Sequence, residues 1–149
     1  MLPVSNKIER SVVLSSKPNE VWEKSFANPE ALKSWFPDKI EGDFAEGTNF
    51  FLIFVDGEEE HRCECKMTEL LANECLEFVW HPGVSSTLTE YPETEVTTVK
   101  FTLEASGDKT KVTMVESGFA KVGKKRRQFA FEANNGGWNI EMAKLPKNY

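Results

Sequence analysis

The chain has 149 residues, of which 40% are hydrophobic and 28% are charged, a composition typical of a single globular domain covering residues 1–149. Its formal net charge of -6 argues against nucleic acid as a partner, because phosphate binding depends on lysine and arginine. The longest apolar run, residues 50–55, is too short to span a membrane, and the first seven residues carry no apolar signal region, so we expect a cytoplasmic protein.

The first part of the chain predicts one strand followed by two short helices. Ile8–Leu14 is rich in β-branched residues at even spacing, as expected for a strand. Ser16 is a candidate cap for a helix with Pro18 in its first turn. Asn28-Pro29-Glu30 repeats this arrangement, and the second helix should end near Trp35-Phe36-Pro37, because proline disfavours helical geometry in the residue before it.

Alternating apolar residues and turn signals predict five further strands. Asp56-Gly57 and Ser106-Gly107-Asp108 are typical of hairpin turns. The polar segment Val84–Glu93 contains a proline and is expected to form a loop. The five predicted strands cover Asn49–Val55, His61–Leu71, Leu76–Trp80, Val99–Leu103 and Thr110–Met114.

The last quarter of the chain, Gln128–Leu145, predicts a long helix. Phe131, Trp138, Met142 and Leu145 recur at steps of seven, four and three, so they share one helix face. Gly136-Gly137 lies at the centre of this segment. Two glycines inside a continuous helix suggest that another part of the chain approaches its backbone closely there.

Six short motifs in this order resemble the family of activators of heat-shock-protein ATPase homologues, within the START-like superfamily often called SRPBCC. The resemblance runs from about Lys7 to Leu145. The motifs are Pro18…Val21-Trp22, Asn28-Pro29-Glu30…Trp35-Phe36, Gly47…Phe50, Leu76…Phe78…Trp80, Glu116-Ser117-Gly118-Phe119 and Gly137-Trp138…Leu145.

This resemblance implies an α+β helix-grip fold, as in START and birch-pollen-allergen proteins. A curved antiparallel sheet of about six to seven strands would wrap around the C-terminal helix, with two short helices after the first strand. Relatives with this fold enclose a cavity for lipids, sterols, polyketides or other apolar small molecules. The family name also implies stimulation of the ninety-kilodalton heat-shock chaperone, although the separate chaperone-binding domain of eukaryotic activators has no counterpart in these 149 residues.

The inward-facing residues have two interpretations, the wall of a ligand cavity or a fully packed core. Both explain aromatic residues at even spacing on strands that face a helix. The candidate ligand-binding residues are Trp35, Phe36, Phe54, Phe78, Trp80, Phe101, Met114, Glu116, Phe131, Trp138 and Met142.

Glu116 is the polar member of this set. Counting by twos from Val112 and Met114 places it on the inward face, where a carboxylate must be paired, hydrogen-bonded or protonated. One interpretation is a polar anchor or an acid/base group at the cavity. The other is a carboxylate at a strand end that turns toward water or pairs with a lysine.

The histidines and cysteines give weaker signals. His81 follows a strand and either faces the cavity mouth or lies on the surface. His61, Cys63 and Cys65 share one strand face, but no second ligand pair completes a zinc site, and we predict no metal and no cofactor. Free thiols are expected, since three cysteines form no disulfide framework.

A basic cluster at Lys121, Lys124, Lys125, Arg126 and Arg127 precedes the final helix and opposes its dipole. It is either a solvated face or a binding surface for an acidic protein or an anionic lipid headgroup.

Our first functional hypothesis is therefore non-enzymatic binding of a small apolar or amphipathic ligand between sheet and helix. The second is an interaction module for a chaperone or another acidic protein surface. The third is a cyclase or hydrolase, for which Glu116 and His81 are the candidate acid and base groups.

Overall fold

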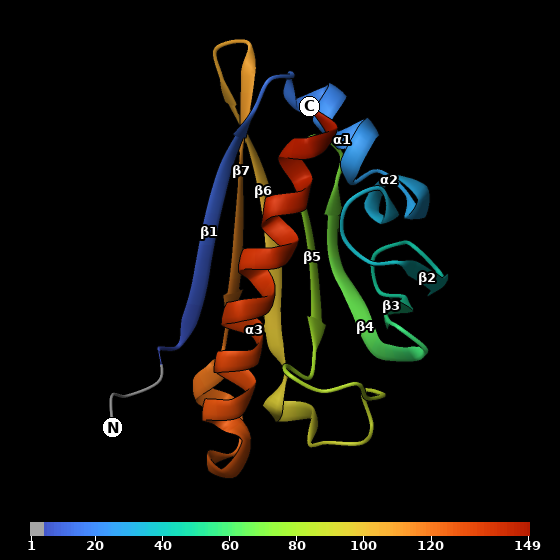
Figure 1. The fold of residues 1–149 in the computed structure, drawn as a ribbon, viewed down its shortest axis with the longest axis vertical. Helices are drawn as coiled ribbons and strands as arrows, with labels where there is room; N and C mark the ends of the chain where they lie inside the picture. The colour runs from blue at the N-terminus through green and yellow to red at the C-terminus, as the bar shows by residue number, and fades with distance from the viewer. Residues whose placement is uncertain (1–4) are drawn as a thin grey trace.

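The computed structural model describes residues 5–149, which form a seven-stranded antiparallel sheet and a long helix lying across one face (Figure 1). Along the sheet the order is β1-β7-β6-β5-β4-β3-β2. The strands are β1 (Lys7–Leu14), β2 (Lys39–Gly42), β3 (Asn49–Asp56), β4 (Glu59–Leu71), β5 (Cys75–Trp80), β6 (Thr97–Ser106) and β7 (Lys109–Ser117). The predicted helix-grip fold is confirmed, with β2 as a strand that the sequence did not reveal.

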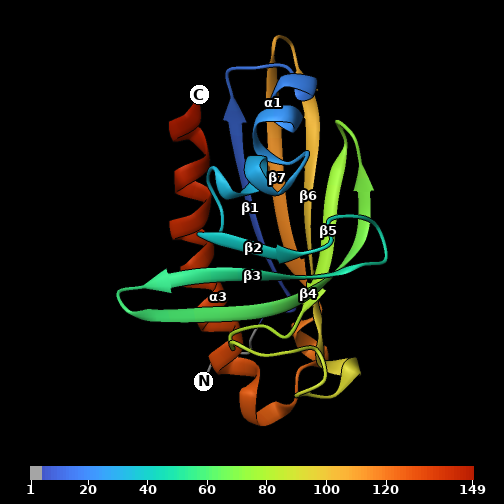
Figure 2. The ribbon, with the colours of Figure 1, turned by 90° about the vertical axis from the view of Figure 1, so that its right-hand side faces the viewer.

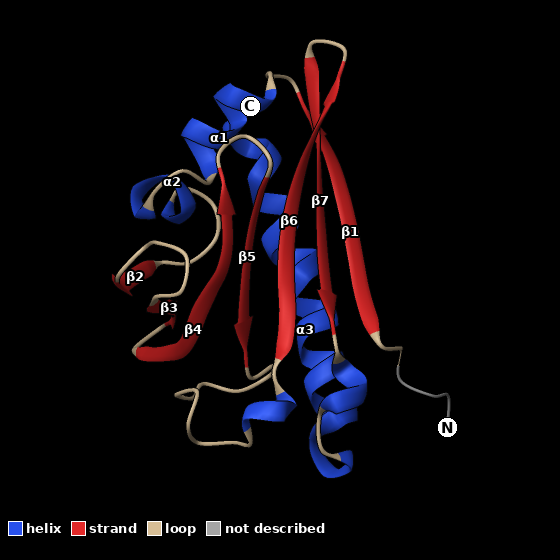
Figure 3. Ribbon diagram, turned by 180° about the vertical axis from the view of Figure 1, so that it is seen from behind, coloured by secondary structure: helices blue, strands red, loops and turns tan. Residues whose placement is uncertain are grey.

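The helices occupy the ends and the concave face of this sheet. Two short helices follow the first strand, as predicted, and the 21-residue C-terminal helix packs on the side opposite to the sheet surface seen in Figure 3. The helices are α1 (Pro18–Ser25), α2 (Pro29–Lys33) and α3 (Lys124–Lys144), with 3-10 turns η1 (Glu93–Glu95), η2 (Phe119–Lys121) and η3 (Leu145–Asn148). None of the helices within residues 5–149 is long and apolar enough to cross a membrane.

The sheet curls because its longest strand is bent. Figure 2 shows β2 and β3 running crosswise to β6 and β7, with β4 making the transition. In β4 the pairing with β5 shifts register between Met67 and Glu69. Such a bulge bends a strand and increases its twist, which brings the β2–β4 end of the sheet around α3.

The caps of the two short helices differ from one another. The Asn28 side chain accepts a 2.9 Å hydrogen bond from the Ala31 N–H, as the sequence predicts. The prediction that Ser16 caps α1 is wrong. Pro18 takes the first helical position, so Lys17 is the N-cap, without a side-chain hydrogen bond. The Ser16 carbonyl instead accepts a 2.7 Å bond from the Thr110 hydroxyl.

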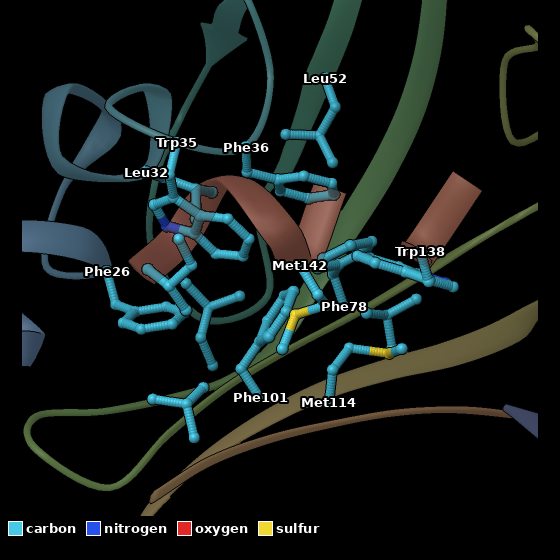
Figure 4. Packing of buried hydrophobic residues seen from close by; sticks show 14 of the residues in the cluster. Phe26, Leu32, Trp35, Phe36, Leu52, Phe78, Phe101, Met114, Trp138 and Met142 are labelled. Atoms are coloured by element: carbon cyan, nitrogen blue, oxygen red, sulfur yellow. The ribbon is translucent and has the colours of Figure 1, made fainter. Parts of the chain in front are cut away.

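Aromatic rings fill the space between the sheet and the helices (Figure 4). Phe101 on β6 is completely buried, and its ring centroid lies within 6 Å of four other rings. These four rings come from the C-cap of α1, the α2–β2 connection and α3, and belong to Phe26, Trp35, Phe36 and Trp138. Phe101 therefore joins three separate elements in one core.

The final helix is continuous through its two glycines and begins at Lys124, four residues before the predicted start. The expectation that Gly136 and Gly137 permit a close backbone approach is wrong, because a Cβ built at either position meets no atom of another element within 4 Å. The close approach occurs instead between Gly83 and Ala130. A Cβ on Gly83 would lie 2.7 Å from the Ala130 Cα, and the φ of Gly83 is +74°.

Candidate functional site

An open cavity of about 590 Å³ lies between α3, the β3–β4 hairpin and the loop that follows β5. Its apolar wall is formed by Phe36, Phe54, Trp80 and Trp138. The rings are in contact, with centroid distances of 5.5 Å for Phe36–Phe54, 5.3 Å for Phe36–Trp138 and 6.4 Å for Trp80–Trp138. A cavity of this size accommodates a small organic ligand.

These four aromatic residues are the members of the predicted ligand set that line the cavity. Five others, Trp35, Phe78, Phe101, Met114 and Met142, are buried in the core, and Figure 4 shows them packed among its side chains. Phe131 packs edge-on against Phe119, 5.1 Å between centroids, and does not line the cavity. The predicted set is therefore divided between residues that line the open cavity and residues packed in the interior.

Glu116 on β7 is completely buried directly behind this wall. The Trp80 indole N–H donates to its Oε2 at 2.9 Å, and the Trp138 indole N–H donates to its Oε1 at 2.8 Å. The Thr97 hydroxyl donates to Oε2 at 2.6 Å, and the Asn134 amide lies 3.0 Å from both oxygens. The alternative of a carboxylate turned toward water or paired with lysine is therefore wrong, because four neutral donors surround it.

The environment of Glu116 has opposing electrostatic effects. Burial raises the pKa of this carboxyl above its ordinary value of 4.5, while the hydrogen bonds from Thr97, Trp80, Trp138 and Asn134 act to lower it. Burial is the larger effect, and no lysine or arginine of residues 5–149 forms an ion pair with this carboxyl. Glu116 does not line the cavity, whereas three of its hydrogen-bond donors, Trp80, Asn134 and Trp138, do.

The polar side of the cavity was largely missed by sequence reasoning. Asp56, His61, Asn134 and Glu141 line it together with His81. These residues come from the β3–β4 hairpin, the residue after β5 and α3, and no periodic pattern connects them. Only His81 was singled out as a candidate for the cavity mouth, and it is 3% exposed rather than a surface residue.

The hydrogen bonding of His81 defines its tautomer. Its Nε2 lies 2.9 Å from the Leu88 carbonyl oxygen, which can only accept, so Nε2 carries a hydrogen. In a neutral imidazole this leaves Nδ1 as an acceptor. Nδ1 is buried and has no hydrogen-bond partner among residues 5–149.

His61 has a partner that the sequence did not predict, because the Ser85 hydroxyl lies 3.3 Å from its Nδ1. Ser85 belongs to the loop after β5, and its position depends on how that loop folds back. The pair lies on the cavity wall, but His61 is exposed and its other nitrogen is 3.9 Å from the highly exposed Glu59 carboxylate. This arrangement lacks the buried, oriented acid of a catalytic triad.

Gly137 lines the cavity on α3, one residue before Trp138. Because no atom of another element would contact a Cβ at this position, the absent side chain leaves space beside the indole wall. The exposed Gly136, which does not line the cavity, has no such role.

Comparison with protein families identifies the chain. The family described as "Activator of Hsp90 ATPase homolog 1-like protein" matches residues 15–148. The chain belongs to this family. A search of curated proteins found no match.

Solved structures similar to this family member include protein MLL2253 from Mesorhizobium loti, with a TM-score of 0.71, 19% identity, and coverage of 95% of this chain and 94% of that one. DynU16, a putative protein in the dynemicin biosynthetic locus, has a TM-score of 0.71 and 19% identity, covering 96% of this chain but only 46% of DynU16. The Aha1 dimer from Colwellia psychrerythraea has a TM-score of 0.66 and 18% identity, with coverage of 95% and 93%. At these identities the likeness concerns the fold alone.

The basic cluster of this Activator of Hsp90 ATPase homolog 1-like chain divides into structural and exposed residues. The Arg126 guanidinium lies 4.0 Å from the centroid of the Tyr91 ring, and Arg127 donates to the carbonyl oxygens of Ala120 and Val122. Lys124 and Lys125 are exposed. The two arginines therefore hold the start of α3 against neighbouring turns, and the lysines remain available to solvent.

The cysteine thiols are poor metal ligands and nucleophiles in this environment. Burial raises the pKa of the Cys63 thiol to about 11, and burial first among several causes also raises the pKa of Cys65 well above its ordinary value. Cys63 Sγ donates to the Val84 carbonyl at 3.4 Å. Residues 5–149 contain no group of three His, Cys, Asp or Glu side chains arranged to hold a metal ion.

Proposed function

We propose that this protein binds a small amphipathic molecule in the cavity beside α3, without doing chemistry on it. The proposal rests on one observation: an apolar wall and a polar wall meet in the same cavity. Phe36, Phe54 and the two indoles offer apolar contact area, while His81 and Asn134 offer polar groups at fixed positions. Ligand sites in proteins commonly combine these two features. The likeness in fold to a putative protein of a biosynthetic locus supports a small organic ligand.

The placement of the two candidate acid/base systems, Glu116 and the His61–Ser85 pair, argues for binding rather than catalysis. Glu116, the buried carboxylate, is separated from the cavity by the groups that donate to it. The exposed His61–Ser85 pair has no buried acid partner. The positions of Glu116 and the His61–Ser85 pair therefore favour a binding site over a catalytic site.

The proposal is tested by filling the cavity from the helix. Gly137→Leu adds a side chain where there is space, and it raises helix propensity, so the variant should fold at least as well as wild type. The neutral dye N-phenyl-1-naphthylamine is the probe, and its fluorescence should rise saturably with wild-type protein. We expect Gly137→Leu to weaken dye binding at least about tenfold by occupying the site.

The matched control is Gly136→Leu, which makes the same change at the neighbouring exposed position outside the cavity. It should bind the dye as wild type does. Equal dye binding by both variants, or no saturable binding by wild type, would contradict the proposed site. Native mass spectrometry of the purified protein then asks whether an adduct is present in wild type and Gly136→Leu but absent from Gly137→Leu.

A second candidate function is contact with a chaperone surface, as the family description suggests. Phe129 is 66% exposed on α3, one turn after Lys125 and on the same helix face. An exposed aromatic residue beside lysines suits an acidic protein partner with an apolar pocket. A Phe129→Ala, Lys125→Ala double variant should lose binding to, and stimulation of, the ninety-kilodalton heat-shock chaperone. This candidate would be contradicted if wild type did not stimulate the chaperone, or if the double variant stimulated it as strongly as wild type does.

A further inference from the structure

We infer that the ligand of this cavity is a protonated amine attached to an aromatic or aliphatic body. The inference rests on the proposed function and adds the charge and hydrogen-bonding class of the ligand. Three independent features of the cavity carry it: the sign of its charged groups, the electronic state of its two indoles, and a buried acceptor without a partner.

The charged side chains that line the cavity are acidic. Asp56 and Glu141 contribute carboxylates, and no lysine or arginine of residues 5–149 lines the wall. Lys144 approaches one of them from outside the lining, since its Nζ lies 2.5 Å from a Glu141 oxygen. Asp56 is exposed and forms no salt bridge within the described part of the chain. A carboxylate-bearing ligand would meet repulsion here, whereas a cation would be attracted.

The hydrogen bonds of the two indoles to Glu116 favour interaction of the indole rings with a cation. Both Trp80 and Trp138 direct their N–H groups at the Glu116 carboxyl, at 2.9 and 2.8 Å. An indole that donates to a carboxylate gains electron density in its ring, which strengthens the attraction of the ring face for a cation. Phe36 stacks on one face of Trp138, with 5.3 Å between the ring centroids, and lines the same cavity.

The buried Glu116 carboxyl also favours a cationic ligand over an anionic one. Glu116 is buried among neutral donors and has no counter-cation in residues 5–149. Burial favours the protonated form of Glu116, and a positive charge on the other side of the indoles would favour its ionised form through a region of low dielectric constant. An anion placed there would add to the repulsion instead.

His81 distinguishes a protonated amine from a cation without N–H groups. Its Nε2–H is used by the Leu88 carbonyl, and its buried Nδ1 lacks a donor. A buried acceptor without a partner costs free energy, and an ammonium N–H is a strong donor to imidazole. His81 lines the cavity with Nδ1 turned into the protein, so a ligand amine satisfies this atom only when binding turns the imidazole edge toward the cavity.

The experiment compares three ligands with the same body and different polar groups: 2-phenylethylamine, 2-phenylethanol and 3-phenylpropanoate. Each is titrated into ¹⁵N-labelled protein at neutral pH while the indole N–H signals of the four tryptophans are followed by NMR. Trp80 and Trp138 report on the cavity. The Trp35 indole, which donates to the Ser25 carbonyl at 2.9 Å and does not line the cavity, is the internal control.

We expect the amine to shift the Trp80 and Trp138 signals, with a Kd at least about tenfold lower than that of the alcohol or the carboxylate. Equal or tighter binding of the alcohol or carboxylate would overturn the amine inference while leaving the proposed function in place. No shift by any of the three ligands at its solubility limit would overturn the amine inference, and with a negative dye experiment it would overturn both.

A charge variant on the rim provides a second test that does not disturb the buried cluster. Asp56→Asn should weaken amine binding about two- to fivefold and leave alcohol binding unchanged, with a smaller effect at high salt. Asp108→Asn makes the same charge change in the exposed β6–β7 turn, which does not line the cavity, and should bind the amine as wild type does. Equal effects of the two variants would contradict a role for the charge at the cavity.

Discussion

The Trp138 indole N–H donates a 2.8 Å hydrogen bond to Oε1 of Glu116, which joins the middle of α3 to the end of β7. Asn134, one turn earlier, makes a second contact to the same carboxyl, and Trp80 and Thr97 connect it to β5 and β6. A single buried acid therefore links the helix to three adjacent strands. The same acid accepts hydrogen bonds from two indoles of the cavity wall, so the packing of the fold and the shape of the cavity depend on one residue.

Glu116→Gln should remove a pH-dependent part of the stability. Burial raises the pKa of Glu116 in the folded state above its ordinary value of 4.5. Between 4.5 and the raised value the folded protein holds more protons than the unfolded chain, so stability falls as pH rises through this window. In urea unfolding at a series of pH values, the wild-type free energy of unfolding minus that of the variant should decrease over the window and then level off. A flat or rising difference would show that burial does not dominate at this site.

Phe101→Ala is expected to destabilise the fold by about 3–5 kcal/mol, because it removes a completely buried ring and leaves a cavity among four others. The free energy of unfolding from urea titration measures this effect. Phe129→Ala is the control, since that ring is 66% exposed and its removal should change stability by less than about 0.5 kcal/mol. Similar losses for both variants would contradict the placement of Phe101 at the centre of the core.

Gly83→Ala should be destabilising for two reasons. The residue has a φ of +74°, and a Cβ there would lie 2.7 Å from the Ala130 Cα, so the loop after β5 must move away from α3. Gly107→Ala shares the first reason with a φ of +62° but has nothing within 4 Å, and so isolates the backbone strain. We expect a loss of about 1–2 kcal/mol for Gly107→Ala and about 1–3 kcal/mol more for Gly83→Ala. Equal melting temperatures would show that the contact with Ala130 can relax.

Cys63 should react slowly with iodoacetamide. Burial raises the pKa of its thiol to about 11 from an ordinary value of 9.0, so the reactive thiolate is about a hundredfold rarer than in an exposed cysteine. Mass spectrometry of the folded protein at mildly alkaline pH measures the rate, with the urea-unfolded protein as reference. Because Cys63 lines the cavity, a bound ligand should slow labelling further. Rapid labelling of the folded protein would contradict this environment.

The sequence predicts the fold well in segments where apolar residues recur at the spacing of a strand or a helix. Phe78 and Trp80 alternate with outward residues, and Trp138 and Met142 lie four apart, so their inward positions follow from strand and helix geometry. The four-residue β2 is too short for such a pattern and was missed. Glu116 was placed correctly on the inward face by counting along β7, but its four donors come from three other elements and depend on the complete tertiary structure.

The candidate site is harder to predict because loops and hairpins build half of it. Phe54 belongs to the aromatic wall and Asp56, two residues later, to the acidic rim. Their common place at the cavity follows from the curl of the sheet and cannot be deduced from their spacing in the sequence. Ser85 meets His61 because the segment after β5 folds back along β4. The role of a glycine is equally hard to predict from the sequence, because Gly137 leaves open space whereas Gly83 permits close contact with Ala130.

The pairing of β1 with β7 has a consequence for how the chain acquires its structure. Lys7 is paired with Ser117, so the first strand joins a neighbour that is made about a hundred residues later. During synthesis at about 5–20 residues per second, β1 must wait several seconds for this partner to emerge. Loop-closure entropy must be overcome before such distant contacts form, which makes this kind of topology slow to fold. The N-terminal strand is therefore the segment for which protection by a nascent-chain chaperone has the longest opportunity to act.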